Sequence, residues 1–136
     1  METSKQRILK EHAIKASKFA HSPYSKYPVG AALETKDGEI FTGCNVESSS
    51  YGLSVCAERN AISAAIVNGH KRFCAMAIYS RNGATPCGAC RQVIWDICGD
   101  IPVYVFDGAG NEKIYRTSEL LPNPFDCRKL EEKRDK

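Results

Sequence analysis

Residues 73–106 read FCAMAIYSRNGATPCGACRQVIWDICGDIPVYVF, and this stretch decides the fold class. Its apolar ends, Phe73–Tyr79 and 101–106, predict two buried strands, since strands buried on both faces of a sheet are almost continuously hydrophobic. Between them, 87–98 predicts a helix that Gly99 ends. A strand, a helix and a second strand in this order indicate an α/β domain with helices packed on its sheet.

The flanking sequence extends this pattern in both directions. Upstream we predict a helix over about 4–20, strands over 29–35 and 39–44, a polar loop over 45–54 and a helix over 55–68. Downstream we predict a strand over 112–116 and a short helical turn over 118–121. The order α-β-β-α-β-α-β-β predicts one domain spanning residues 1–136, with helices on a mixed sheet.

Composition limits the classes of partner. The chain has 136 residues, 43% of them hydrophobic, and a net charge of +3, which is too small to indicate a nucleic-acid or anionic membrane surface. Several of its charges lie in the mixed tail 128–136, which we interpret as a solvated, mobile end. Without a long apolar run or a secretion signal, we expect a soluble, cytoplasmic protein that binds neither membrane nor nucleic acid.

The chain has seven cysteines, at positions 44, 56, 74, 87, 90, 98 and 127. An odd number without a secretion signal argues against a disulfide framework and favours metal or catalytic use. Cys87 and Cys90 form a C-x-x-C at the start of a predicted helix, where both thiols lie on one face and the helix N-terminus favours thiolates. Taken alone, this pair is also compatible with a redox couple or with two core thiols.

A second motif makes the metal interpretation more specific. Cys56-Ala57-Glu58 also opens a predicted helix, so three thiolates from two helix N-termini can meet at one Zn²⁺ and leave its fourth position open for water. C-x-E together with P-C-x-x-C is the known pattern of zinc deaminases, in which the glutamate moves protons and is not a ligand. The alternative is a structural Cys₄ site with Cys44 as fourth ligand, which leaves Glu58 without a role.

The chemistry of such a site needs a proton carrier and a source of positive charge. Glu58 would take a proton from the attacking water, then protonate the ring nitrogen, and finally protonate the departing amine. Three thiolates weaken the metal as a Lewis acid, and we expect the guanidinium of Arg59 to offset their charge. Gln92, just after the second motif, is a further candidate donor to a thiolate.

Around these residues the chain resembles cytidine deaminase of the short, homotetrameric, zinc-dependent class. The resemblance runs from Tyr24 to Phe125 and rests on YSKYPVGAA (24–32), GCNVE (43–47), CAER (56–59), PCGACRQV (86–93) and LLP (120–122). It implies a three-layer α/β/α domain with a five-stranded mixed sheet. It also implies one Zn²⁺ per subunit and the hydrolysis of cytidine and deoxycytidine to uridine and deoxyuridine with release of ammonia.

The resemblance also assigns substrate contacts. It implies that Asn45 and Glu47 hold the ribose hydroxyls, that the backbone of Ala57 binds the pyrimidine carbonyl, and that Tyr27 packs against the base, where the family commonly has phenylalanine. By position, Tyr51 and Phe125 are the candidates for reaching into the site of a neighbouring subunit of the homotetramer. The resemblance thus implies a small-molecule nucleoside as the partner.

Two other functions remain open from the residues alone. One is a related deaminase that acts on another base, on a blasticidin-type nucleoside or on a polynucleotide. Polynucleotide binding would require a basic tract, and Glu47 would repel a phosphate placed on the ribose. The other is a non-catalytic zinc module that mediates contacts between proteins.

Overall fold

The fold was analysed in a computed structural model, which describes residues 3–128 and 130. Apart from Arg128 and Leu130, the charged tail 128–136 lies outside the described residues. In chain order the elements are α1 (Ser4–Ser17), β1 (Gly30–Thr35), β2 (Ile40–Cys44), η1 (Tyr51–Leu53), α2 (Ala57–Val67), β3 (Phe73–Tyr79), α3 (Gly88–Cys98), β4 (Pro102–Phe106), β5 (Glu112–Arg116) and α4 (Thr117–Leu120).

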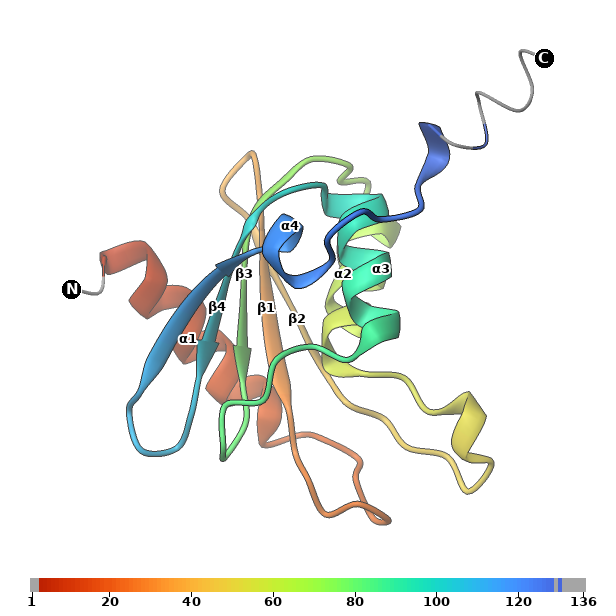
Figure 1. The fold of residues 1–136 in the computed structure, drawn as a ribbon. Coiled ribbons are helices and arrows are strands. Elements are labelled where there is room, and N and C mark those ends of the chain that lie inside the picture. The colour runs from red at the N-terminus through yellow and green to blue at the C-terminus, as the bar shows by residue number, and fades with distance from the viewer. Residues whose placement is uncertain (1–2, 129, 131–136) are drawn as a thin grey trace.

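The five strands form one mixed sheet in the order β2-β1-β3-β4-β5. Among the strands of the described residues, β3 and β4 are the parallel pair, and α3 connects them, as the quoted stretch predicts. Helix α1 covers one face of the sheet, whereas α2 and α3 lie side by side on the other (Figure 1). The predicted α/β class and the three-layer α/β/α arrangement are therefore confirmed.

Each face of the sheet has its own core. Alanines of the central strands, among them Ala32 and Ala77, pack against Leu9 and Ala13 of α1. The larger core lies under α2 and α3 and contains Leu33, Met76, Ile78, Ile62 and Ile94. Small residues under α1 let that helix approach the sheet closely, and the apolar surface removed from water on both faces stabilises the layers.

Helix boundaries differ from the prediction where tertiary contacts intervene. Helix α1 ends at Ser17, three residues before the predicted end. The Ser17 hydroxyl donates to the carbonyl of Ile14 (2.6 Å). The chain then leaves the helix axis because His21 donates to the carbonyl of Asn45 and pairs with Val46. At the start of α1, Thr3 and Gln6 form the predicted capping box. None of the helices in the described part of the chain has the length and hydrophobicity that crossing a membrane requires.

Helix α2 is positioned by the absence of a side chain at Gly43 in β2. A Cβ atom there would lie 2.4 Å from the amide nitrogen of Ala61 and 2.5 Å from the carbonyl oxygen of Ala57. These are backbone atoms of α2, so only a shift of the helix could relieve the overlap.

We therefore expect Gly43→Ala to lower the free energy of unfolding by about 1–3 kcal/mol or more, as measured by urea denaturation. Gly52→Ala is the matched control, since a Cβ at Gly52 meets no atom within 4 Å. It should change stability by less than about 0.5 kcal/mol. Equal stability of the two variants would show that α2 does not depend on close contact with β2.

Candidate active site

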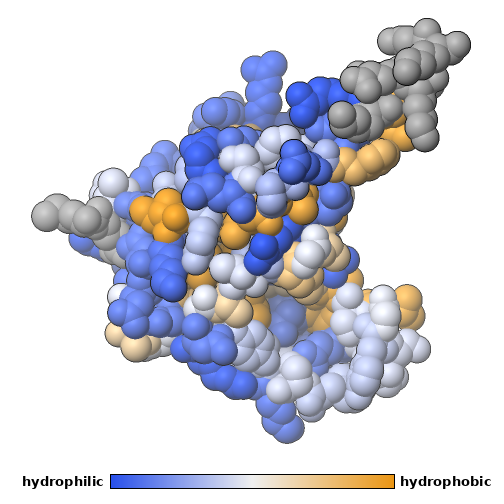
Figure 2. All heavy atoms as spheres, in the orientation of Figure 1, coloured by the Kyte–Doolittle hydropathy of each residue, from blue (hydrophilic) through white to orange (hydrophobic). Residues whose placement is uncertain are grey.

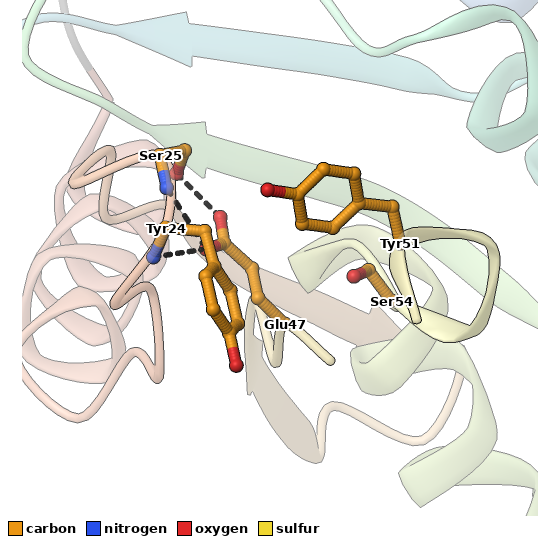
Figure 3. A pocket seen from close by; sticks show the side chains of 5 residues that line it. All are labelled: Tyr24, Ser25, Glu47, Tyr51 and Ser54. Carbon is orange, nitrogen blue, oxygen red and sulfur yellow. Dashed lines mark hydrogen bonds between the residues drawn. The ribbon is translucent and has the colours of Figure 1, made fainter. Parts of the chain in front are cut away.

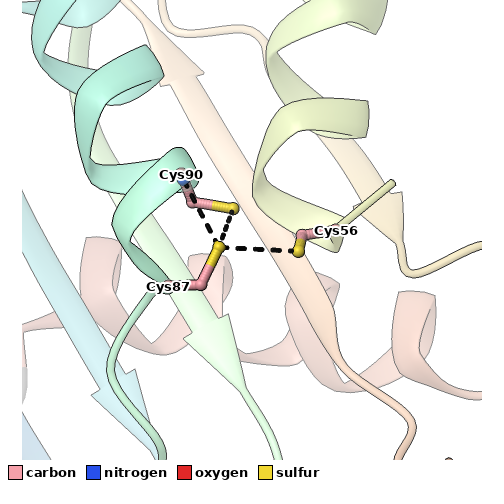
Figure 4. A group of neighbouring side chains, drawn as sticks. All are labelled: Cys56, Cys87 and Cys90. Carbon is pink, nitrogen blue, oxygen red and sulfur yellow. Dashed lines mark hydrogen bonds between the residues drawn. The ribbon is translucent and has the colours of Figure 1, made fainter. Parts of the chain in front are cut away.

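The sulfur atoms of Cys56, Cys87 and Cys90 meet where α2 and α3 begin (Figure 4). Cys56 and Cys87 are the N-cap residues of these helices, and Cys90 lies one turn into α3. The Cys87 sulfur is 3.8 Å from that of Cys56 and 3.4 Å from that of Cys90. Residues 31 positions apart in sequence thus converge because the two helices start at the same end of the sheet.

This geometry fits one tetrahedral zinc ion. With metal–sulfur distances of about 2.3 Å, tetrahedral ligands lie about 3.8 Å from one another. The three sulfurs all lie within 4.8 Å of one another. In the described part of the chain no fourth histidine, cysteine or acidic side chain joins this group, so Cys44 and Glu58 are outside it. Three protein ligands with an open fourth position are typical of catalytic zinc.

Positive charge lies beside the sulfur cluster. The Nη2 atom of Arg59 donates to the sulfur of Cys56 (3.6 Å). Hydrogen bonds with Cys90, Arg59 and Cys87 lower the pKa of the Cys56 thiol to about 5, although burial acts in the opposite direction. Arg59 thus stabilises the anionic sulfur that a metal ligand requires.

Glu58 is the second residue of α2 and is buried, with 4% of its surface exposed. Burial raises the pKa of its carboxyl group to about 7, and the nearby Cys56 acts in the same direction. A carboxyl group with a pKa near neutrality can both accept and return a proton at that pH. Its place next to the sulfur cluster but outside the ligand set suits a proton carrier.

A cavity of about 310 Å³ opens onto these groups. Cys56, Ala57, Glu58 and Cys87 contribute to its wall. Side chains from the segments before β1 and after β2 line it as well, among them Tyr27, Val29, Asn45 and Glu47. The metal-ligand motif and the predicted sugar-binding pair therefore face one space.

Asn45 and Glu47 share one side of an extended segment, because Val46 between them pairs with both His21 and Val55. The Asn45 amide accepts from the backbone nitrogen of Val29 and donates to the carbonyl of Tyr27, both at 2.9 Å. Each amide atom has capacity for one more hydrogen bond, so the side chain can still bind a ligand.

The Glu47 carboxylate accepts hydrogen bonds from the hydroxyl and the backbone nitrogen of Ser25 and from the nitrogen of Tyr24. The bond from the Ser25 hydroxyl is the main reason that the pKa of Glu47 is lowered. The carboxylate is therefore ionised at neutral pH and held in one orientation. The sequence analysis did not identify Ser25, although a serine next to Tyr24 in the 24–32 motif was a usable signal.

Tyr51 and Phe125 do not line this cavity. Tyr51 lies on η1 and bounds a neighbouring pocket of about 360 Å³ together with Tyr24 and Glu47 (Figure 3). Its ring stands edge-on to that of Tyr24, with 5.8 Å between centroids. Phe125 is 57% exposed at the C-terminal end of the chain. Neither side chain contributes to the cavity that holds Glu58.

Gln92, the predicted donor to a thiolate, points its amide away from the sulfur cluster in this structure. Its amide nitrogen donates to the carbonyl of Phe125 (2.6 Å) and to the carboxylate of Asp96 (3.1 Å). The reason is tertiary: the segment after α4 returns along α3 and presents its backbone to Gln92 (Figure 1). Trp95, one turn further along α3, similarly donates to Asp126 (3.0 Å).

Comparison with known proteins identifies the family. A family model described as the cytidine and deoxycytidylate deaminase zinc-binding region matches residues 3–106. A cytidine deaminase of Sporosarcina psychrophila is 45% identical over 82% of this chain and 84% of its own length. One from Halalkalibacterium halodurans is 43% identical over 89% and 93%, respectively.

Solved structures agree with these relatives. The crystal structure of cytidine deaminase from Burkholderia pseudomallei superposes with a TM-score of 0.85 at 40% identity, covering 88% of this chain and 98% of that one. Residues 3–106, which the family model matches, include both cysteine motifs and Glu58. The chain therefore belongs to the cytidine and deoxycytidylate deaminase family and is a zinc-dependent hydrolytic deaminase.

Proposed function

We propose that this protein hydrolyses cytidine and deoxycytidine to uridine and deoxyuridine, consuming one water molecule and releasing one ammonia. The observation that carries the proposal is a single cavity. Its lining includes Cys56, Cys87 and Glu58, and it also includes Asn45 and Glu47. The first set suits attack of water on an amino-bearing ring carbon, and the second suits recognition of a sugar.

Cys56, Cys87 and Cys90 would hold the ion. Bound there, Zn²⁺ supplies a Lewis acid that makes water at its open position more acidic. Glu58 accepts a proton from the attacking water as the water oxygen bonds to the ring carbon, and passes that proton to the ring nitrogen. It then takes the second proton from the hydroxyl group formed on that carbon and gives it to the amine, which leaves as ammonia while the carbonyl forms. One buried carboxyl group can accept and return both protons because a pKa of about 7 suits both directions.

The sugar is recognised by groups fixed before it arrives. Ser25 and Tyr24 hold the Glu47 carboxylate, which accepts a hydrogen bond from a ribose hydroxyl. The unused capacity of the Asn45 amide serves a hydroxyl in the same way. The backbone of Ala57 binds the pyrimidine carbonyl and Tyr27 packs against the base. An ionised Glu47 also disfavours a phosphate on the ribose, so we infer that free nucleosides are the substrates.

We further infer that the chain acts as one catalytic domain and assembles as a homotetramer in which Tyr51 and Phe125 complete neighbouring sites. Exposed apolar residues support an assembly, since monomers rarely expose large patches of them. They include Val46, Leu53, Ile66, Val67, Ile97 and Phe125. In Figure 2 apolar residues gather around the hollow between the 45–54 loop and the C-terminal segment. We also infer a cytoplasmic location, because reducing conditions keep the metal-binding thiols available.

The test is the ultraviolet absorbance change that follows loss of the amino group from cytosine. Zinc-loaded protein should deaminate cytidine and deoxycytidine, and should leave CMP and adenosine unchanged. Faster turnover of blasticidin S than of cytidine would favour the related deaminase instead. No turnover of any of these compounds by zinc-loaded protein would favour a structural zinc module. Fast turnover of CMP would contradict the argument from Glu47.

Removing the charge of Arg59 tests its role beside the thiolates. We expect Arg59→Gln to lower kcat for cytidine about 10- to 100-fold, the usual cost of losing a group that supports a metal ligand. Arg59→Lys should recover part of this loss, because it restores the charge without the guanidinium geometry. Steady-state kinetics together with zinc content would check both variants. Unchanged kcat in Arg59→Gln would show that the three thiolates need no compensating cation.

A further inference from the structure

Tyr27 is connected to a loop 55 residues away in sequence. Its hydroxyl donates a hydrogen bond to the side-chain oxygen of Asn82, in the loop that follows β3. The guanidinium carbon of Arg81 lies 4.8 Å from the centre of the Tyr27 ring, in a cation–π contact. Consecutive residues of one loop therefore bind both the edge and the face of this aromatic side chain.

The same loop also holds the backbone that precedes the ring. Lys26 has a φ of 56°, in the left-handed region that non-glycine residues seldom adopt. Its carbonyl accepts a hydrogen bond from Nη1 of Arg81 (2.8 Å), and its nitrogen donates to the carbonyl of Ser22 (2.9 Å). Arg81 thus contacts the turn and the ring at once, so it restrains where the turn directs Tyr27.

The loop that supplies these contacts is itself well anchored. Gly108 donates to the carbonyl of Arg81 (3.2 Å), and the Ser80 hydroxyl accepts from the nitrogen of Ala84 (3.2 Å). Further along, the Thr85 hydroxyl accepts from Nη2 of Arg91 (2.8 Å). Arg91 follows the metal-ligand motif on α3, so one hydrogen-bonded loop joins the Tyr27 side of the cavity to the Cys87 side.

We propose that Arg81 and Asn82 are positioning residues for Tyr27, holding its ring as a preformed wall of the nucleoside cavity. The proposal rests on the deaminase function inferred above and deepens it at the base-binding side. The hydrogen bond from Tyr27 to Asn82 requires the tyrosine hydroxyl. It is therefore a feature of this chain and cannot form where phenylalanine occupies the position. A preformed wall improves substrate binding because less side-chain freedom is lost when the nucleoside enters.

A double-mutant cycle on the Tyr27 hydroxyl and the Asn82 side chain tests this. Tyr27→Phe and Asn82→Ala should each raise KM for cytidine about three- to tenfold, with kcat within about twofold, as expected for loss of uniform binding. The double variant should be no worse than either single one, because both remove the same hydrogen bond. Asn68→Ala is the control, since Asn68 donates to Ala64 at the far end of α2. It should leave KM unchanged.

Amide hydrogen exchange over residues 22–29 gives a readout that does not depend on turnover. Exchange there should accelerate to the same extent in Tyr27→Phe, Asn82→Ala and the double variant. Unchanged exchange, additive effects on KM, or accelerated exchange with unchanged KM would each overturn the proposal. If the wild-type protein turned over no nucleoside while the exchange results held, the proposed function would be wrong, but Asn82 would still be shown to position Tyr27.

Discussion

Replacing Glu58 with glutamine should lower kcat for cytidine by at least about 10³-fold while the protein still binds one Zn²⁺ per chain. Proton transfer by a positioned side chain typically contributes 10²–10⁴-fold, and here one carboxyl group serves several transfers. Glutamine has nearly the same shape but cannot accept and return a proton. Because Glu58 lies outside the sulfur cluster, the metal site should be unaffected.

Folding should also survive this change. Burial raises the pKa of Glu58, which means that the ionised form is disfavoured in its surroundings. A neutral amide of the same size avoids that cost, so we expect Glu58→Gln to melt at the same temperature as the wild type or above it. Glu11→Gln, on the exposed surface of α1, is the matched control and should keep full activity.

The measurements are kcat by ultraviolet absorbance, zinc by atomic absorption, and Tm. Loss of zinc from Glu58→Gln would mean that the carboxylate is a ligand. A kcat within tenfold of the wild type, with zinc retained, would assign proton transfer to another group. The zinc content and kcat together separate the two roles, because the sulfur of Cys56 would bind the metal whereas the carboxyl group of Glu58 would carry the proton.

Features set by neighbouring residues could be predicted from the sequence. Strands β3 and β5 begin and end as predicted. An apolar run defines the extent of β3, and a turn precedes β5. The ligand pair Cys87 and Cys90 follows from the i, i+3 spacing of a helix, and Cys56 with Glu58 follows from the start of another. In these cases the local pattern contains the information on which the structure depends.

Features that depend on distant segments could not be predicted this way. Gln92 faces the backbone of Phe125 because the C-terminal segment returns along α3, 33 residues later. The hydroxyl of Tyr27 can donate to Asn82 because the loop after β3 contacts the segment before β1. No spacing rule connects such pairs, so their partners become visible only when the sheet order is known.

The second large effect concerns the metal itself: Cys56→Ser should abolish stable zinc binding and lower kcat/KM by more than about 100-fold. Mutating a group that supports a metal ligand typically lowers metal affinity or activity about 10- to 100-fold, so loss of a ligand itself should lower them further. Serine keeps the size of the side chain but offers a hydroxyl that stays protonated. Two cysteines alone would then hold an ion whose catalytic geometry needs three protein ligands.

Two further cysteine variants make this result specific. Cys127→Ser changes an exposed thiol outside the cluster and should retain one zinc ion and full activity. Cys44→Ser separates the two kinds of zinc site. A structural Cys₄ site that uses Cys44 would lose its ion in that variant, whereas the three-cysteine site should keep it. Zinc retained in Cys44→Ser and lost in Cys56→Ser would leave the fourth position to water, which is the condition for hydrolysis at this site.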